Sequence, residues 1–151
     1  MSDKYTLGWR EWLALPDLGI PRIKAKVDTG ARTSCLHAFY IDPFRRHGAA
    51  WVRFGVHPVQ RNDDDVLHCE AAILDQRQVA DSGGHRELRY VIETRLQLAG
   101  FDDTIELTLT NRDSMRFRML LGRTALGAGG FVVDPARSYL AGQKPNQGDS
   151  Q

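Results

Sequence analysis

The sequence lacks several features that would assign it at once to a class of proteins. It has only two cysteines, Cys35 and Cys69, which cannot build a disulfide framework, so we expect a reducing compartment. No apolar run approaches the length of a membrane span, and the first residues lack the basic-then-apolar layout of a signal peptide. The formal net charge of +1 argues against a general nucleic-acid binder. These absences predict a cytoplasmic protein with neither a membrane nor a nucleic-acid partner.

Motifs for metal and phosphate chemistry are missing as well. There is no His-Glu-x-x-His and no Cys-x-x-Cys, and the glycine-rich stretch 122–130 lacks the Gly-Lys-Ser/Thr ending of a phosphate-binding loop. A zinc site would have to assemble in space from Cys35, His37, His68, Cys69 and Glu70. We therefore predict no cofactor and no metal, and keep a zinc-dependent hydrolase as an alternative.

A long apolar period of 3.6 residues is also absent, and short alternating runs between turn residues predict an all-β fold. The expected strands lie within 6–15 and at 22–27, 34–41, 50–56, 66–74, 91–98, 104–110, 116–121 and 131–133. Residues 62–65 should form a polar turn, and 124–126 should begin one short helical turn. We expect one domain over 1–141, followed by a polar, disordered tail at 142–151.

One stretch carries the residues of a known chemistry. A half-buried strand at 22–27 is broken by Asp28-Thr29-Gly30, where glycine permits a sharp turn and the short polar side chains can bond the backbone. Packing can then fix the direction of the carboxylate. In aspartic peptidases two such carboxylates share one proton, so that one polarises the substrate carbonyl and the other activates a water. The tripeptide alone also fits an ordinary capped loop.

The surroundings of this loop resemble the retropepsins, which are single-lobed, virus-type aspartic peptidases. Asp28-Thr29-Gly30-Ala31 with Thr33 resembles their active-site loop, and the apolar pair before Gly122-Arg123 resembles their second signature. A wider pattern runs from Gly19-Ile20-Pro21 through Ala31-Arg32-Thr33-Ser34 and then from Leu107-Thr108-Leu109-Thr110-Asn111-Arg112 to Gly122-Arg123. It is similar to a bacterial family labelled "ATP-dependent zinc protease", and the resemblance covers about residues 9–140. That family is retropepsin-like and often associated with an ATP-grasp ligase that adds glutamates to a ribosomal protein. The resemblance implies a closed retropepsin-like β-barrel with one short helix.

The chain has a single Asp-Thr-Gly loop, because the second candidate, Asp134-Pro135-Ala136, lacks Thr-Gly. The resemblance implies a homodimer in which a two-fold axis brings the two Asp28 side chains together. It also implies that a hairpin centred on Gly83-Gly84 is a flap over the substrate; a mobile hairpin without substrate contact is the alternative. The implied roles are catalytic for Asp28, Thr29 and Gly30, substrate-binding for Ala31, Arg32, Gly83 and Gly84, and structural support for Gly122 and Arg123.

The chain departs from the retropepsin pattern at one position. Viral retropepsins usually carry an acid two residues after the glycine, and that acid pairs with the arginine of the second motif, whereas this chain has Arg32. Two arginines cannot pair, so Arg123 needs another acid, such as Glu70 or Glu93, and Arg32 can face a ligand.

The cations near the loop predict an acidic substrate. Arginine forks bind carboxylates with two hydrogen bonds. Arg32 could be joined in the cleft by Lys24, Lys26, Arg89 and Arg95, or these side chains could form a solvated outer face. We predict an aspartic endopeptidase that acts on glutamate-rich tails, with a functional link to the ligase. A non-catalytic module that binds acidic tails is the second alternative.

Overall fold

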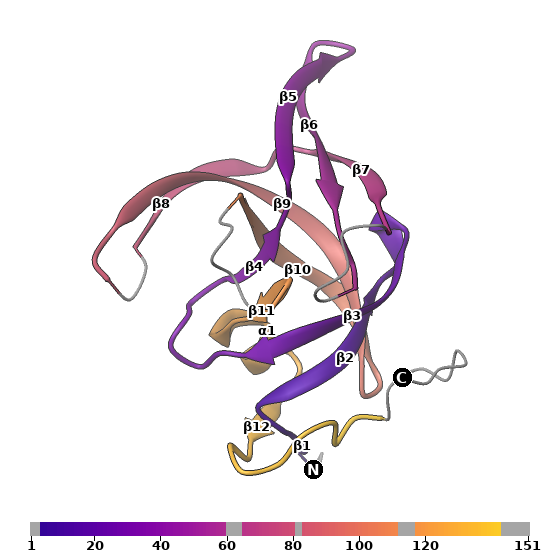
Figure 1. Ribbon diagram of the computed structural model, residues 1–151, viewed down its shortest axis with the longest axis vertical. Helices are drawn as coiled ribbons and strands as arrows, with labels where there is room; N and C mark the ends of the chain where they lie inside the picture. Colours follow the sequence, from indigo (N-terminus) through magenta and orange to yellow (C-terminus); the bar gives the residue numbers. More distant parts are fainter. Residues whose placement is uncertain (1–3, 60–64, 81–82, 112–116, 143–151) are drawn as a thin grey trace.

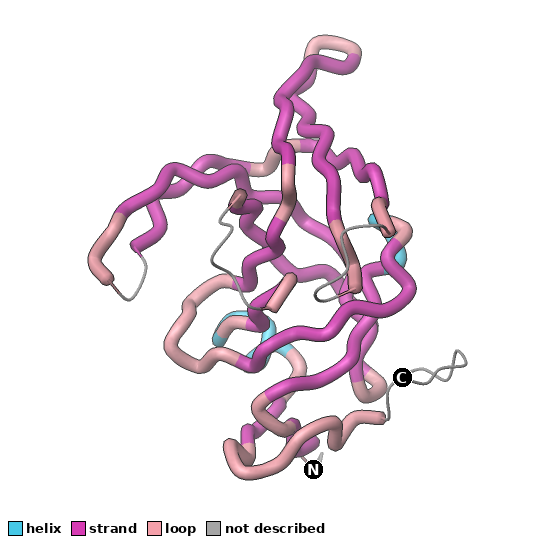
Figure 2. The backbone as a smooth tube through the Cα atoms, viewed as in Figure 1, coloured by secondary structure: helices cyan, strands magenta, loops and turns pink. Residues whose placement is uncertain are grey.

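The computed structural model describes residues 4–59, 65–80, 83–111 and 117–142, and strands dominate this part of the chain (Figure 2). The strands are β1 (Tyr5–Leu7), β2 (Arg10–Leu15), β3 (Ile20–Val27), β4 (Ser34–His37), β5 (Tyr40–Arg46), β6 (Ala49–Val56), β7 (Leu67–Ala72), β8 (Asp75–Ala80), β9 (Arg86–Leu98), β10 (Phe101–Thr110), β11 (Met119–Leu121) and β12 (Phe131–Val133). A 3-10 turn, η1 (Pro16–Leu18), and one α-helix, α1 (Arg123–Ala128), complete the elements. The predicted all-β class is confirmed as far as a mostly-β fold with one short helix in the described residues.

The largest sheet has the strand order β10-β4-β11-β3-β2-β9-β8, and β10 pairs with β9 as well. This extra pairing makes a ring of six strands, from which β8 extends as an edge strand. The ring is completed between β2 and β9 by the single pair Ala14 and Gln97. The strand pairing therefore shows a ring of strands. That this ring is a closed barrel stays a prediction.

Two smaller sheets flank the ring (Figure 1). Strands β5, β6 and β7 form an antiparallel sheet, and β1 and β12 form a parallel pair near the chain ends. The β8–β9 hairpin is a long arm that arches away from the rest of the fold (Figure 1). No helix in the described ranges is long and apolar enough to cross a bilayer.

Buried and exposed side chains alternate along β3, the strand that leads into the Asp28 loop. Ile23, Ala25 and Val27 are buried in the core, whereas Lys26 on the opposite face is exposed. The other fully buried large side chains come from nearly every strand: Leu7, Leu15, Ile20, Leu36, Phe54, Ile92, Leu96, Leu107, Leu109, Met119 and Leu121. A single apolar cluster thus holds β3 and its neighbours in place.

A buried carboxylate ties the two ends of the described chain together. Glu11 lies on the inward face of β2 and is fully buried. Its Oε2 accepts hydrogen bonds from the backbone N–H groups of Gly8 (2.6 Å) and Leu140 (2.9 Å), and its Oε1 accepts one from Ala141 (3.0 Å). These bonds satisfy an acid that would otherwise be costly to bury. This buried acid was not among the residues predicted from the sequence.

The structure differs from the predicted strands in several places. The strand expected at 34–41 is divided, because β4 ends at His37 and β5 begins at Tyr40. The β5–β6 hairpin was missed; it turns at His47 and Gly48, both with positive φ, as a two-residue hairpin turn requires. β11 is shorter than expected. Residues 62–64, residue 116 and the tail beyond 142 lie outside the described residues.

Candidate active site

Asp28 lies at the end of β3, beside the end of the parallel strand β11. Its backbone N–H donates to the carbonyl oxygen of Leu121 (2.9 Å), so the loop begins where the pairing of β3 and β11 ends. The Gly30 N–H donates to Asp28 Oδ1 (2.9 Å), and the Ala31 N–H donates to the Asp28 carbonyl oxygen (3.2 Å). The half-buried carboxylate is therefore oriented by its own turn.

The second motif lies directly against this loop. The N–H groups of Arg123 and Thr124 donate to the carbonyl oxygens of Ala31 (2.8 Å) and Arg32 (3.0 Å). The Gly122 N–H donates to Ser34 Oγ (2.9 Å). A Cβ on Gly122 would lie 2.7 Å from the carbonyl carbon of Thr33, so a larger residue cannot fit without moving the loop.

Arg123 contacts the loop through its side chain as well. Its Nη1 donates to the carbonyl oxygen of Thr29 (3.0 Å). Glu70 is not its partner, because Glu70 pairs with Arg46 (2.5 Å) and Arg53 (3.1 Å) on another sheet. Across the described ranges no acid pairs with Arg123, so neither Glu70 nor Glu93 is the partner that was predicted for it. A backbone carbonyl takes that place.

A cleft of about 610 Å³ opens beside Asp28. The loop forms one part of its lining, the arm strands β8 and β9 form another, and residues of β4, β10, β11 and α1 complete it. The lining residues are Asp28, Gly30, Ala31, Arg32, Thr33, Cys35, Arg77, Gln78, Val79, Ala80, Arg89, Thr108, Leu120 and Arg123. Among the residues that the structure describes, Asp28 is the one carboxylate in this lining.

The cleft brings together a different set of cations from the one expected. Arg32 and Arg89 line it as predicted, and Arg77 and Arg123 join them. The other three cations do not line it: Lys24 lies near the rings of Trp12 and Phe117 (5.8 Å to each centroid), Arg95 pairs with Asp102 (2.7 Å), and Lys26 is exposed elsewhere on β3. Within the described part of the chain, four arginines and one carboxylate thus line the cleft.

Two of these arginines are neutralised by acids of the same chain. Arg77 binds Glu106 through two hydrogen bonds (2.6 and 3.2 Å) and Asp75 through a third (3.0 Å). The hydrogen bonds from Arg77 are the main cause that lowers the pKa of Glu106; partial burial opposes them, and the charges of Arg77 and Arg32 add to them. The same two acids raise the pKa of Arg77 further above its usual range.

Arg89 is buried, with 8% of its surface exposed, and is held by a network. Its Nε donates to Glu87 Oε1 (2.8 Å), which also accepts a hydrogen bond from Thr110 Oγ1 (2.9 Å), and its Nη1 donates to Cys35 Sγ (3.3 Å). In contrast, the side chain of Arg32 has no hydrogen bond or close ion pair to any described residue, and Arg123 faces only a carbonyl. The uncompensated positive charge of the cleft therefore belongs to Arg32 and Arg123.

The predicted flap tip lies away from this lining. Gly83 and Gly84 are exposed at the end of the β8–β9 arm, and Gly84 has a positive φ of 81°. Residues 81–82 lie outside the described residues. Val79 and Ala80 of β8 reach the cleft, but the two glycines do not line it. Their role in substrate binding stays a prediction.

The candidate zinc ligands are dispersed. No group of three or more histidine, cysteine, aspartate or glutamate side chains is placed to hold a metal within the described ranges. Cys69 donates to the Leu18 carbonyl oxygen (3.3 Å), and burial raises the pKa of its thiol to about 11, which disfavours the thiolate that binds zinc. His68 is hydrogen-bonded to Tyr40 (2.7 Å).

Asp134, the second carboxylate considered from the sequence, forms a turn like that of Asp28. Its Oδ1 accepts a hydrogen bond from the Ala136 N–H (3.0 Å). It does not line the cleft, so the described chain supplies one carboxyl group to the site.

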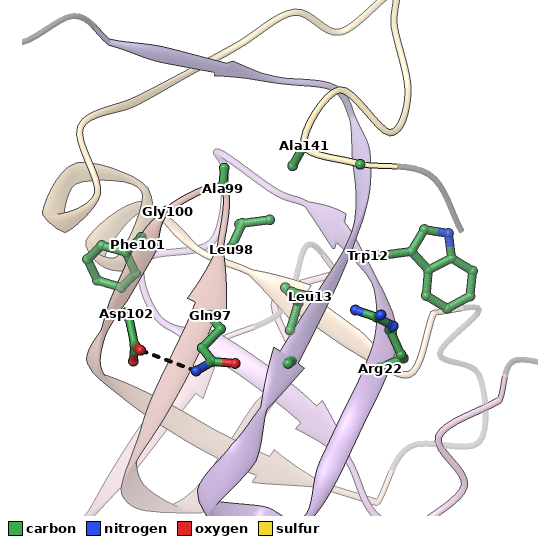
Figure 3. Close-up of a pocket in the computed structure, with 12 residues that line it drawn as sticks. Trp12, Leu13, Arg22, Gln97, Leu98, Ala99, Gly100, Phe101, Asp102 and Ala141 are labelled. Carbon is green, nitrogen blue, oxygen red and sulfur yellow. Dashed lines mark hydrogen bonds between the residues drawn. The ribbon is translucent and has the colours of Figure 1, made fainter. Parts of the chain in front are cut away.

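A second pocket of about 420 Å³ lies between β2 and the β9–β10 turn. Figure 3 shows Gln97 and Asp102 joined by a hydrogen bond on one side of it, with Trp12 and Arg22 on the other. Arg95 already pairs with Asp102 and lowers its pKa. This pocket therefore lacks an acid placed for catalysis, and the Asp28 cleft is the candidate active site.

The sequence is similar to that of known proteins over almost its whole length. A protein-family model named RimB-like and described as "Retropepsin-like aspartic endopeptidase RimB" matches residues 6–144. A "Probable alpha-L-glutamate ligase" of Shewanella pealeana is 50% identical over 145 residues, which are 95% of this chain and 31% of that protein. A protein of the same name from Parasynechococcus marenigrum is 50% identical over 142 residues, 94% of this chain and 30% of that protein. The chain thus spans about a third of the length of these curated relatives.

A solved structure shares the fold. The crystal structure of protein Lpg0085 of Legionella pneumophila, described as having unknown function, matches with a TM-score of 0.75 and 27% sequence identity. The match covers 91% of this chain and 98% of that one.

Proposed function

The chain belongs to the RimB-like family of retropepsin-like aspartic endopeptidases, and on that premise we propose that it hydrolyses peptide bonds as a homodimer. The observation that carries the proposal is the Asp28 carboxylate, oriented by the Gly30 N–H at the edge of a cleft large enough for peptide side chains. Since one chain supplies one carboxyl, the second comes from the same loop of a partner across a two-fold axis.

The loop geometry supports this arrangement. The Gly30 N–H holds Oδ1 of Asp28, which leaves Oδ2 for the attacking water and the partner's carboxyl. The paired acids retain one proton: the protonated one polarises the scissile carbonyl, and the ionised one takes a proton from water as it attacks. The hydroxyl of Thr29 has no partner among the described residues, which leaves it available for a hydrogen bond to the partner's loop across the two-fold axis.

We further propose that the substrates are acidic, glutamate-rich peptide tails. Arg32 and Arg123 give the cleft positive charge that no acid of the described chain neutralises at close range. The curated relatives are named as glutamate ligases, and each has roughly two thirds of its length beyond the region similar to this chain. A ligase adds glutamates by forming amide bonds, and a peptidase would break such bonds with water. The two activities would thus act on the same product, which supports a functional link to a ligase.

Two further predictions belong to this proposal. The ring of six strands would be a closed barrel of retropepsin type, as the family resemblance implies. The protein would act in the cytoplasm, where its two buried cysteines remain free thiols.

One other function has an observation in its favour. The relatives' ligase names and the chain's share of their length also fit a binding module that holds an acidic tail without cutting it. The two functions differ in their dependence on Asp28, because binding through arginines does not require an acid that activates water.

The test compares wild-type protein with Asp28→Asn and Asp134→Asn on a glutamate-rich peptide and a neutral peptide of equal length. Asp134→Asn is the matched control, since it alters the same kind of turn outside the cleft. We expect Asp28→Asn to lower the cleavage rate by roughly 10²–10⁴-fold, the usual contribution of an acid–base group, and Asp134→Asn to leave it unchanged. Cleavage should persist with a chelator and fall on dilution as dimers dissociate.

Other outcomes would overturn this proposal. Binding of the acidic peptide without cleavage, unchanged in Asp28→Asn, would establish the binding module. Cleavage that stops when metal is removed would establish the zinc hydrolase. A protein that is monomeric by light scattering while fully active would remove the paired-carboxyl mechanism.

A further inference from the structure

The guanidinium group of Arg77 is fully occupied. Its Nη1 and Nη2 donate to Oε1 and Oε2 of Glu106 (2.6 and 3.2 Å), and its Nε donates to Asp75 (3.0 Å). The pair with Glu106 has the two-pronged geometry that arginine uses to bind a free carboxylate. Glu106 therefore stands where an acidic ligand of Arg77 would bind.

This ion pair is not a local contact between neighbouring strands. Arg77 belongs to β8, the edge strand of the arm, whereas Glu106 belongs to β10, and β9 lies between them. Arg77 also lines the cleft, and both side chains keep 36% of their surface exposed. A peptide in the cleft can thus reach Arg77 without unfolding the arm.

A second arginine of the cleft, Arg32, also acts on Glu106. It lines the same cleft, and its charge acts on Glu106, although the two form no hydrogen bond. One cation near Glu106 is therefore occupied, and the other has no close partner among the described residues.

We propose that Arg77 and Arg32 form a carboxylate-binding subsite of the cleft, and that Glu106 is its internal occupant, displaced from Arg77 by an acidic side chain of the bound peptide. This inference rests on the proposed function. The exchange replaces one carboxylate by another, so Arg77 keeps its two-pronged pairing, and the displaced Glu106 stays in the field of Arg32. A glutamine side chain cannot make this exchange, because it offers one acceptor and no charge. Arg77 thereby selects acids over amides, and Glu106 competes with the acidic ligand for it.

The test measures binding rather than cleavage, in the full chain carrying Asp28→Asn. Two peptides of equal length are used, one rich in glutamate and one rich in glutamine. Glu106→Gln is compared with Glu70→Gln, which removes the same charge from an arginine-paired glutamate on β7, outside the cleft. We expect Glu106→Gln to bind the glutamate peptide about fivefold more tightly, equivalent to ~1 kcal/mol, with no change for the glutamine peptide.

Arginine variants test the same subsite in the opposite direction. Arg77→Gln should remove most of the preference for the glutamate peptide. Arg77→Lys should restore only part of it, because lysine keeps the charge but not the fork. Arg95→Gln, which breaks an ion pair outside the cleft, should leave the preference unchanged.

The outcomes separate this inference from the proposed function. If the parent protein binds the two peptides equally, the acidic substrate class is wrong. If the parent prefers glutamate but Glu106→Gln behaves like Glu70→Gln, or binds more weakly, the acidic substrate stands and the internal occupant is wrong. Equal effects of Arg77→Gln on both peptides would reduce Arg77 to a structural role.

Discussion

Replacing Glu11 by glutamine converts one buried carboxylate into an amide of nearly the same size. The carboxylate accepts three backbone N–H groups: those of Gly8 and Leu140 on Oε2 and that of Ala141 on Oε1. Glutamine has one oxygen. Its best orientation keeps that oxygen at the Oε2 position and turns its NH2 group toward the N–H of half-buried Ala141, so that two donors face each other.

The free-energy change follows from these contacts. A hydrogen bond to a charged group contributes roughly 1.5–3 kcal/mol, and a buried donor left without a partner costs about 1–3 kcal/mol. The neutral amide is easier to bury than the carboxylate, which offsets part of this loss. We therefore expect Glu11→Gln to lower the free energy of unfolding by about 2–3 kcal/mol. In a chain of this size that lowers Tm by roughly 5–10 °C.

Urea unfolding followed by circular dichroism measures the change, with Glu93→Gln as the control because Glu93 is exposed on β9. The control should change the stability by less than about 0.5 kcal/mol. An effect of Glu11→Gln equally small would show that the three N–H groups find other partners, and that this carboxylate does not hold the chain ends together.

Two further predictions concern the site. Gly122→Ala should lower the free energy of unfolding by about 1–3 kcal/mol, because its Cβ would meet the loop backbone at 2.7 Å. The control Gly127→Ala has open space around its Cβ and should be neutral or stabilising by up to ~1 kcal/mol. Equal urea midpoints for the two variants would refute the clash at Gly122. Arg77 lowers the pKa of Glu106, so their ion pair should contribute about 0.2–1 kcal/mol to the stability at pH 7. This contribution is lost as the pH falls from ~4.3, the ordinary glutamate pKa, through the lowered pKa of Glu106 in the folded protein. Urea unfolding at several pH values should show the gap between wild type and Glu106→Gln closing in acid; a gap that widens there contradicts this sign.

The Asp28 loop was predictable because its structure is local. A strand pattern, a turn glycine and a short acid specify a carboxylate held by the backbone two residues on, and the Gly30 N–H makes that bond. The contacts between this loop and the second motif are not local. Their adjacency followed from the family resemblance, and the replacement of an acidic partner by the Thr29 carbonyl could not be predicted, because a backbone acceptor leaves no mark in the side-chain sequence.

Glu11 was missed although the sequence carries a signal for it. In β2 it shares the inward face with Leu13 and Leu15, both buried. An acid at an apolar position of an alternating strand must find donors in the core. One donor, the Gly8 N–H, is local, but the other two belong to Leu140 and Ala141, which lie far away in the sequence.

The alternation of buried and exposed residues along β9 does not predict which arginines line the cleft. Arg89 and Arg95 are six positions apart on β9 and so project from the same face of the strand. In the arm the odd-numbered face is the inner one, since Arg89 and Val91 are buried; from Ile92 to Leu98 the buried residues are the even-numbered ones. Val91 and Ile92 are both fully buried, which marks the point where β9 passes from the arm into the sheet and the core changes sides.

A single alternating pattern carried through β9 therefore puts Arg95 in the cleft, whereas Arg95 pairs with Asp102 on the surface. The same reasoning overlooks Arg77, which lies directly opposite Arg89 in the antiparallel register of the arm and shares its face. The hairpin register would have predicted Arg77, because a residue paired with a cleft-facing partner faces the cleft as well. The positive charge beside Asp28 is thus set by the register of β8 on β9 and by the position where β9 leaves the arm, and not by the number of basic residues in the strands around the site.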